Sequence, residues 1–267
     1  MNKYEFTGET KVVFDVTLRQ IRALVTIGEG VTAGDTGGWI EAEKNLSQTG
    51  NAWVSGDAQV YGNAQVYGDA WVYGNAQVYG NAQVSGDAHV YGNAWVSGDA
   101  WVSGDAWVSG DAWVYGNARV YGNAQVSGDA QVYGNARVSG DAQVYGNARV
   151  SGNAQVYGNA RVYGNAQVSG DAQVYGNAQV YGNAQVSGDA SLFWVSKVGT
   201  ENGTLTVFNN ASGTLTVTRG CFIGSDVEFL EKSERVHDEK THREYCLLIE
   251  FARSRIQCKA CTTEHQS

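Results

Sequence analysis

The chain has 267 residues, with 35 glycines, no proline and a net charge of −9. Without proline it is not collagen, and its 43% hydrophobic and 11% aromatic content exclude an acidic disordered chain. The negative charge argues against a nucleic-acid partner, because phosphate backbones are bound by clustered cations. The first residues show no basic-then-apolar leader, and no run of about 18 apolar residues predicts a membrane span. We therefore expect a cytoplasmic protein with no membrane partner.

Residues 1–49 precede a long repeat and are expected to close its first turn. Val12-Val13-Phe14 and the apolar stretch 21–25 predict a pair of strands within residues 10–28. An open coil exposes unpaired strand edges, which invite aggregation, so both of its ends need a cover. The sequence therefore predicts an N-terminal β cap over residues 1–49.

A six-residue repeat occupies residues 50–193. Valine stands at every sixth position from Val54 to Val186, and Leu192 takes the next place in a unit that reads Ala-x-Val-(Tyr/Ser)-Gly-(Asn/Asp). Ala and Val point to one side of a short strand, x and Tyr/Ser point to the other, and the Gly-Asx pair forms a turn. Three units per turn give 18-residue coils. We predict about eight coils of parallel strands around a core of valine and alanine.

The pattern Val-x-Gly-(Asn/Asp)-Ala-x resembles the hexapeptide repeat of the left-handed parallel β-helix family, best known from acyltransferases. The resemblance implies an all-β, left-handed coil and, because helices of this family usually trimerise, a homotrimer. Residues 31–40 (VTAGDTGGWI) and 45–48 (NLSQ) resemble the segment that precedes the repeats in uncharacterised bacterial and prophage hexapeptide proteins. Those proteins carry transferase labels on the basis of fold, which is weak ground for function.

The outward x position is mostly glutamine, but some repeats place a large side chain there. It is occupied by Trp53, Trp71, Trp95, Trp101, Trp107, Trp113, His89, Arg119, Arg137, Arg149 and Arg161. Counting in steps of 18 places Trp95, Trp101 and Trp107 on three faces of one coil. Trp113 then lies above Trp95.

Exposed aromatic columns have two interpretations. Rings can stack on one another and become buried between subunits, or they can form a platform for a glycan or for the apolar surface of a protein partner. We favour the first interpretation. The candidate binding residues are Trp95, Trp101, Trp107, Trp113, Arg119 and Arg137.

Acyl transfer needs a histidine general base near a subunit interface and a loop that leaves the coil to hold the acyl-CoA donor. His89 is the only histidine in the repeats and is the catalytic candidate. No insertion interrupts the valines, and no acidic residue outside the turn motif lies near His89 in sequence. We therefore favour a non-catalytic structural or interaction protein without a cofactor. The alternatives are a trimeric acyltransferase, a glycan-binding platform and an acidic rod that mimics DNA.

Residues 194–267 predict a second cap, made of a hairpin and two helices, that resembles a module of phage-borne proteins of unknown role. Residues 205–208 and 215–218 flank a five-residue loop. Capping boxes at 225–228 and 241–244 open helices that run to about His237 and about Gln257. The apolar stripes at helical spacing are Val227, Leu230 and Val236 on the first helix and Tyr245, Leu248, Ala252 and Ile256 on the second.

The four cysteines all lie in this terminal segment, as Cys221, Cys246, Cys258 and Cys261. Cys258 and Cys261 have the spacing of zinc ligands, but a second pair at similar spacing is missing. We therefore predict no metal site. Four thiols without an obvious pairing fit a reducing cytoplasm.

Overall fold

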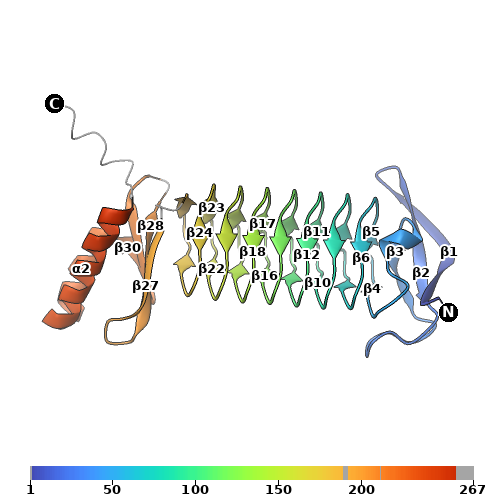
Figure 1. Ribbon diagram of the computed structural model, residues 1–267, viewed down its shortest axis with the longest axis horizontal. Coiled ribbons are helices and arrows are strands. Elements are labelled where there is room, and N and C mark those ends of the chain that lie inside the picture. The colour runs from blue at the N-terminus through green and yellow to red at the C-terminus, as the bar shows by residue number, and fades with distance from the viewer. Residues whose placement is uncertain (1, 189–191, 211, 257–267) are drawn as a thin grey trace.

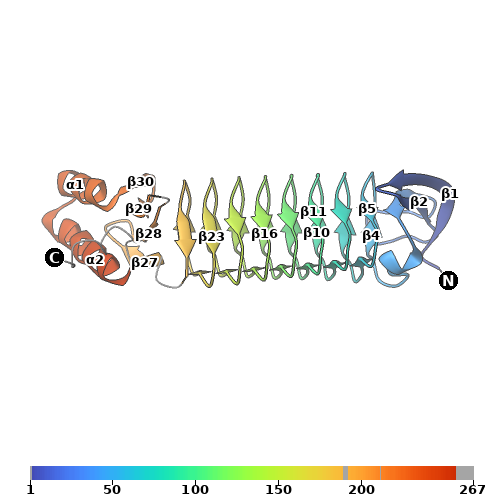
Figure 2. The ribbon, with the colours of Figure 1, turned by 90° about the horizontal axis from the view of Figure 1, so that it is seen from above.

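The structure, a computed structural model, describes residues 2–188, 192–210 and 212–256. It is an elongated rod with a regular coil in its middle and a different cap at each end (Figure 1). Each six-residue repeat contributes one short strand and one turn, and three consecutive strands complete one coil. Seen from above, the coils stack as evenly spaced layers (Figure 2).

The coil has three faces of parallel strands, and each face takes every third strand. The first face contains β5 (Gln59–Val60), β8 (Gln77–Val78), β11 (Trp95–Val96), β14 (Trp113–Val114), β17 (Gln131–Val132), β20 (Arg149–Val150), β23 (Gln167–Ser169) and β26 (Gln185–Ser187). The second face contains β6 (Gln65–Val66), β9 (Gln83–Val84), β12 (Trp101–Val102), β15 (Arg119–Val120), β18 (Arg137–Val138), β21 (Gln155–Val156) and β24 (Gln173–Val174). The third face contains β4 (Trp53–Val54), β7 (Trp71–Val72), β10 (His89–Val90), β13 (Trp107–Val108), β16 (Gln125–Val126), β19 (Gln143–Val144), β22 (Arg161–Val162) and β25 (Gln179–Val180). The predicted stack of about eight parallel coils is confirmed, and its left hand stays a prediction.

The core of the coil consists of valine and alanine side chains stacked from one coil to the next. Every repeat valine from Val54 to Val186 is at most 1% exposed, and so is each repeat alanine from Ala52 to Ala184. Backbone amides join the layers, as where the Trp95 amide donates to the Ala112 carbonyl at 2.9 Å. Small β-branched and methyl side chains suit this interior because both fit a narrow prism without a polar atom to satisfy.

The corners of the prism require glycine. Gly110 has a φ of +68°, and a Cβ added there would lie 2.9 Å from the amide nitrogen of Gly128 in the next coil. At many corners an Asn side chain donates to the Asx of the next coil, as where Asn93 Nδ2 donates to Asp111 Oδ1 at 2.9 Å. Where the donor is an Asn, these side-chain bonds tie neighbouring corners together.

The N-terminal cap continues the first face. β1 (Tyr4–Val13) and β2 (Val16–Ala23) form an antiparallel hairpin, and β3 (Thr36–Ile40) pairs antiparallel with β2 and parallel with β5. The predicted strand pair is confirmed, although it begins earlier than expected. Val12 and Phe14 lie at the exposed hairpin end, 68% and 74% exposed, and do not cover the coil.

Side chains donate hydrogen bonds to backbone carbonyls of the first coil that no strand covers. Lys3 Nζ donates to the Ala52 carbonyl at 2.7 Å, and Asn45 Nδ2 donates to the Ala64 carbonyl at 2.9 Å. Asn45 ends a short 3-10 helix, η1 (Glu43–Asn45). Burial lowers the pKa of Lys3 to about 8, although the carboxylate of Asp69 partly offsets this effect.

A four-stranded antiparallel sheet caps the other end, and the predicted hairpin forms its centre. Its strands are β27 (Leu192–Val198), β28 (Gly203–Asn209), β29 (Leu215–Arg219) and β30 (Phe222–Ser225). Phe208 is fully buried against the end of the coil, and Thr206 Oγ1 accepts from the Gln179 amide at 3.2 Å. Leu192, which the repeat pattern places in a twenty-fourth unit, instead begins β27 and pairs with Phe208. The prediction for this position was wrong because the repeat pattern does not show where the chain leaves the coil.

The helices α1 (Asp226–Val236) and α2 (Glu239–Arg255) pack beside this sheet. The Ser225 capping box is confirmed. The second helix begins earlier than predicted because Asp238 is its cap, accepting from the Thr241 amide at 2.8 Å.

The stripe predicted for α1 was wrong at two of its three residues, since only Leu230 packs against the buried core of this cap. Val227 and Val236 are 54% and 60% exposed, whereas Phe229 is buried against Tyr245. On α2, by contrast, Tyr245, Ala252 and Ile256 of the predicted stripe are buried.

Candidate functional site

Four tryptophans form a belt around the rod, and we name Trp95, Trp101, Trp107 and Trp113 the tryptophan belt. They lie on the consecutive strands β11 to β14. Trp95 and Trp113 pair on the first face, Trp101 lies on the second and Trp107 on the third. The structure therefore confirms the predicted distribution of these residues over three faces.

The belt is presented to solvent by a rigid backbone. Trp101, Trp107 and Trp113 are 44%, 45% and 42% exposed, while the valine that follows each of them is fully buried. Trp95 is half-buried because its ring stacks on that of Trp113, with centroids 4.9 Å apart and planes 5° from parallel. Exposed rings of this size on ordered strands form a surface that favours apolar contact.

The two arginines of the candidate site lie on the second face. The Arg119 guanidinium lies over the Trp101 ring, 5.3 Å from its centroid, and Arg137 occupies the next layer. The structure therefore brings the two arginines together with Trp101 only. Trp95, Trp107 and Trp113 lie on other faces, so the candidate residues form a ring around the rod and no single pocket.

Two further tryptophans of the x position are covered by the N-terminal cap, which the repeat pattern does not show. Trp53 is 1% exposed and packs against Gly37, where an added Cβ would meet its ring at 2.6 Å. Trp71 is half-buried, with Gly30 against its ring. The glycines near these rings, in the segment before the repeats, are the signal that could have indicated the covering.

His89 lies on the third face between Trp71 and Trp107. Its ring is 5.5 Å from that of Trp107 and 6.0 Å, edge-on, from that of Tyr73. Its Nδ1 is buried and has no hydrogen-bond partner among the described residues. A general base needs a group that orients its ring and fixes its tautomer, and the contacts of His89 are with aromatic rings instead.

Tyrosine ladders extend the aromatic surface along the rod. The rings of Tyr145, Tyr163 and Tyr181 stack in succession, with centroids 4.8 Å and 4.7 Å apart. Burial, together with the neighbouring phenols, raises the pKa of Tyr163 to about 12. Stacking of this kind was predicted from the repeat, and it stabilises each face in the manner of other cross-strand pairs.

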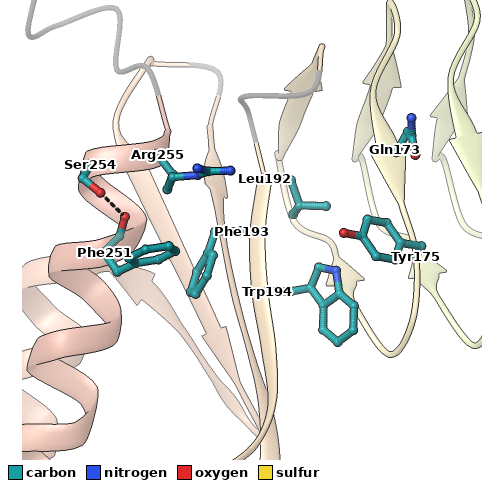
Figure 3. A pocket seen from close by; sticks show the side chains of 8 residues that line it. All are labelled: Gln173, Tyr175, Leu192, Phe193, Trp194, Phe251, Ser254 and Arg255. Carbon is teal, nitrogen blue, oxygen red and sulfur yellow. Dashed lines mark hydrogen bonds between the residues drawn. The ribbon is translucent and has the colours of Figure 1, made fainter.

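A groove lined by the last coil, β27 and α2 was not predicted from the sequence (Figure 3). It has a volume of about 750 Å³. Tyr175 of the coil faces Trp194 edge-on at 5.4 Å, and Phe193 packs at 5.4 Å against Phe251 of α2. Arg255 lies at the rim. The Phe193–Trp194 pair, placed where the repeat ends, is the only signal of this groove in the sequence.

Cys258 and Cys261, which have the spacing of zinc ligands, lie outside the described residues, so the prediction that they form no metal site is not tested. Among the residues that are described, no group of three His, Cys, Asp or Glu side chains is placed to hold a metal ion. None of the helices in these residues is long and apolar enough to cross a lipid bilayer.

The repeats match the family described as YdcK beta solenoid repeat. The matching segments are 58–74, 64–80, 76–98, 88–104, 112–128, 130–142, 142–156, 154–170 and 172–188, all within the coil. No curated protein matches the chain. The coil geometry and the matching repeats together identify a β-solenoid repeat protein.

Proposed function

We propose that this β-solenoid repeat protein is a non-catalytic structural and interaction rod whose tryptophan belt is the contact surface between copies of the chain. One observation carries the proposal: three of the four belt residues are more than 40% exposed, each on a different face. Large aromatic side chains are enriched in the cores of protein interfaces, where their burial supplies much of the association energy.

The distribution of the belt over several faces supports a closed trimer. In a ring of three identical chains, each chain contacts two neighbours through two different surfaces. Trp101 and Trp107, on the second and third faces, provide two such surfaces at the same height on the rod. The family resemblance of the repeat also favours three copies.

The outward glutamines suggest a direct experiment, because glutamine is the usual x residue and keeps the strand intact. We would measure the solution mass of the wild-type chain and of the triple variant Trp101→Gln/Trp107→Gln/Trp113→Gln by light scattering. The wild type should have three times the 28.6 kDa of one chain, and the variant should be monomeric. Arg149→Gln, outside the belt, is the matched control and should leave the trimer unchanged. A monomeric wild type would exclude self-association.

The alternative functions predict different results in binding experiments. An acyltransferase would bind acyl-CoA in a calorimetric titration and lose that binding in His89→Ala. A glycan platform would show quenching of tryptophan fluorescence by oligosaccharides, and the triple belt variant would abolish it. The aromatic surroundings of His89 and the uninterrupted strands between Trp53 and Ser187, all of them described, support the non-catalytic proposal.

We further propose a bacterial or phage setting and a cytoplasmic location. The resemblance of residues 31–40 to bacterial and prophage proteins supports the setting. Cys221 and Cys246 are free thiols, which supports a reducing compartment.

A further inference from the structure

The terminal helices hold a thiol, an imidazole and a hydroxyl in contact. His242 and Cys246 lie four residues apart on α2 and therefore share one face of the helix. The Cys246 Sγ is 3.4 Å from His242 Nε2, and the His242 Nδ1 is 3.2 Å from the Oγ of Ser233 on α1. The two helices lie side by side at the end of the rod (Figure 2).

This arrangement assigns a role to each nitrogen of the ring. Ser233 is only 2% exposed, and its hydroxyl lies beside Nδ1. With a proton on Nδ1 that is donated to the Ser233 oxygen, Nε2 carries the lone pair and can accept the proton of the Cys246 thiol. A nucleophile beside a base that a third group orients is the arrangement on which covalent catalysis depends.

Solvent reaches the thiol through a cavity of about 290 Å³ between the helices. The cavity is lined by Val227, Leu230, Glu231, Glu234, His242, Cys246 and Arg253. Arg253 forms an ion pair with Asp226 at 2.6 Å. In the described part of the chain, Glu231 and Glu234 have no such partner, so the rim of the cavity favours a cationic reactant over an anionic one.

We propose that Cys246 is a reactive thiol that exchanges with small cationic disulfides, with His242 as its base and Ser233 as a positioning residue. The thiol proton moves to His242 Nε2, and the Cys246 sulfur attacks one sulfur of the disulfide. The S–S bond of the reactant breaks as a mixed disulfide forms, and the departing thiolate takes the proton from the imidazolium. No other oxidant is needed, because the disulfide itself is reduced. The site is independent of the tryptophan belt.

The test measures the rate of mixed-disulfide formation at each cysteine by peptide mass mapping. The full chain carries Cys258→Ser and Cys261→Ser, so that only Cys246 and the exposed Cys221 react, and the probe is cystamine at pH 7. We expect Cys246 to react faster than Cys221, although Cys221 is the more exposed. The dianionic 3,3′-dithiodipropionate should react with Cys246 more slowly than cystamine does. The double variant Glu231→Gln/Glu234→Gln should bring the rates of Cys246 with these two probes closer together.

Variants of two histidines distinguish the effect of the proposed base, His242, from the effect of changing any histidine in this part of the chain. An ordinary thiol is only a few per cent ionised at pH 7, so a base that takes its proton raises the fraction of reactive thiolate. The gain in rate is smaller than the gain in thiolate, because the nucleophilicity of a thiolate falls as the acidity of its thiol rises. We therefore expect His242→Gln to slow the reaction of Cys246 about fivefold. The rate at Cys221 should not change. His237→Gln is the matched control, since His237 packs on Tyr245 and should leave both rates unaltered. Ser233→Ala should also slow Cys246, and Ser233→Thr, which keeps a hydroxyl, should restore the rate.

Two results would overturn the proposal. One is a folded His242→Gln chain in which Cys246 keeps its wild-type rate. The other needs no variant: the ratio of the Cys246 rate to the Cys221 rate should fall toward one in urea, and an unchanged ratio would show that the folded contacts do not activate the thiol.

Discussion

Replacing Gly110 by alanine tests whether the corners of the coil need glycine for its backbone conformation alone or also for space. Gly110 has a φ of +68°, a region that costs a residue with a Cβ roughly 1–2 kcal/mol. The new methyl would also lie 2.9 Å from the Gly128 nitrogen, so one coil must move away from the next. Overpacking of this kind costs about 1–3 kcal/mol. We therefore expect Gly110→Ala to lower the free energy of unfolding by about 3 kcal/mol in total.

Gly170 provides a matched control because both glycines stand in the same local sequence, Val-Ser-Gly-Asp-Ala. Its φ is +62°, but the nearest atom to an added Cβ is the Gly188 nitrogen at an ordinary 3.5 Å. Gly170→Ala should therefore cost only the conformational part, about 1–2 kcal/mol. Urea unfolding followed by circular dichroism gives both values. Equal losses in the two variants would refute the argument that contact between coils excludes a Cβ.

The two remaining predictions concern pH. The pKa of Lys3, lowered to about 8 by burial, lies below its ordinary value of 10.5, so the unfolded chain binds more protons between these values and stability rises with pH. The melting temperature of the wild type should therefore rise relative to that of Lys3→Met between pH 7.5 and pH 9.5, and parallel curves would contradict this. The pKa of Tyr163 is raised to about 12, so the folded chain keeps a proton that the unfolded chain loses near pH 10, and stability should fall as the pH rises above 10. The absorbance at 295 nm should show a phenol that ionises at a higher pH than an ordinary tyrosine. Tyr163→Phe should remove an absorbance change near pH 12, and loss of an absorbance change near pH 10 instead would show that the pKa of Tyr163 is not raised.

The repeat could be predicted in detail because its signal is local. Each unit carries its own strand, turn and core residues, and the period of 18 fixes which side chains share a face, so Trp95 and Trp113 could be paired without a structure. The ends depend on contacts between distant segments. The covering of Trp53 requires the cap to fold back over the third face, and a six-residue period holds no information about that.

The terminal module shows the same limit. The Ser225 capping box predicted the start of α1, because its hydrogen bonds are made within four residues. The buried face of α1 could not be found in this way, because Phe229 is selected by its contact with Tyr245 of the next helix. The contact between His242 and Ser233 also joins two helices, and spacing within either helix does not reveal it.

Three strands per coil also mean that the length of the rod and the orientation of its end are linked. Loss or gain of 18 residues, one whole layer, shortens or lengthens the rod and leaves the terminal helices pointing in their original direction. Loss of a single six-residue unit would rotate everything beyond it by one third of a turn, so that residues above the cut would join different faces from those below. Duplication or loss of such units therefore has two kinds of outcome. A multiple of three units changes only the length of the rod, and any other number also changes the orientation of its terminal helices.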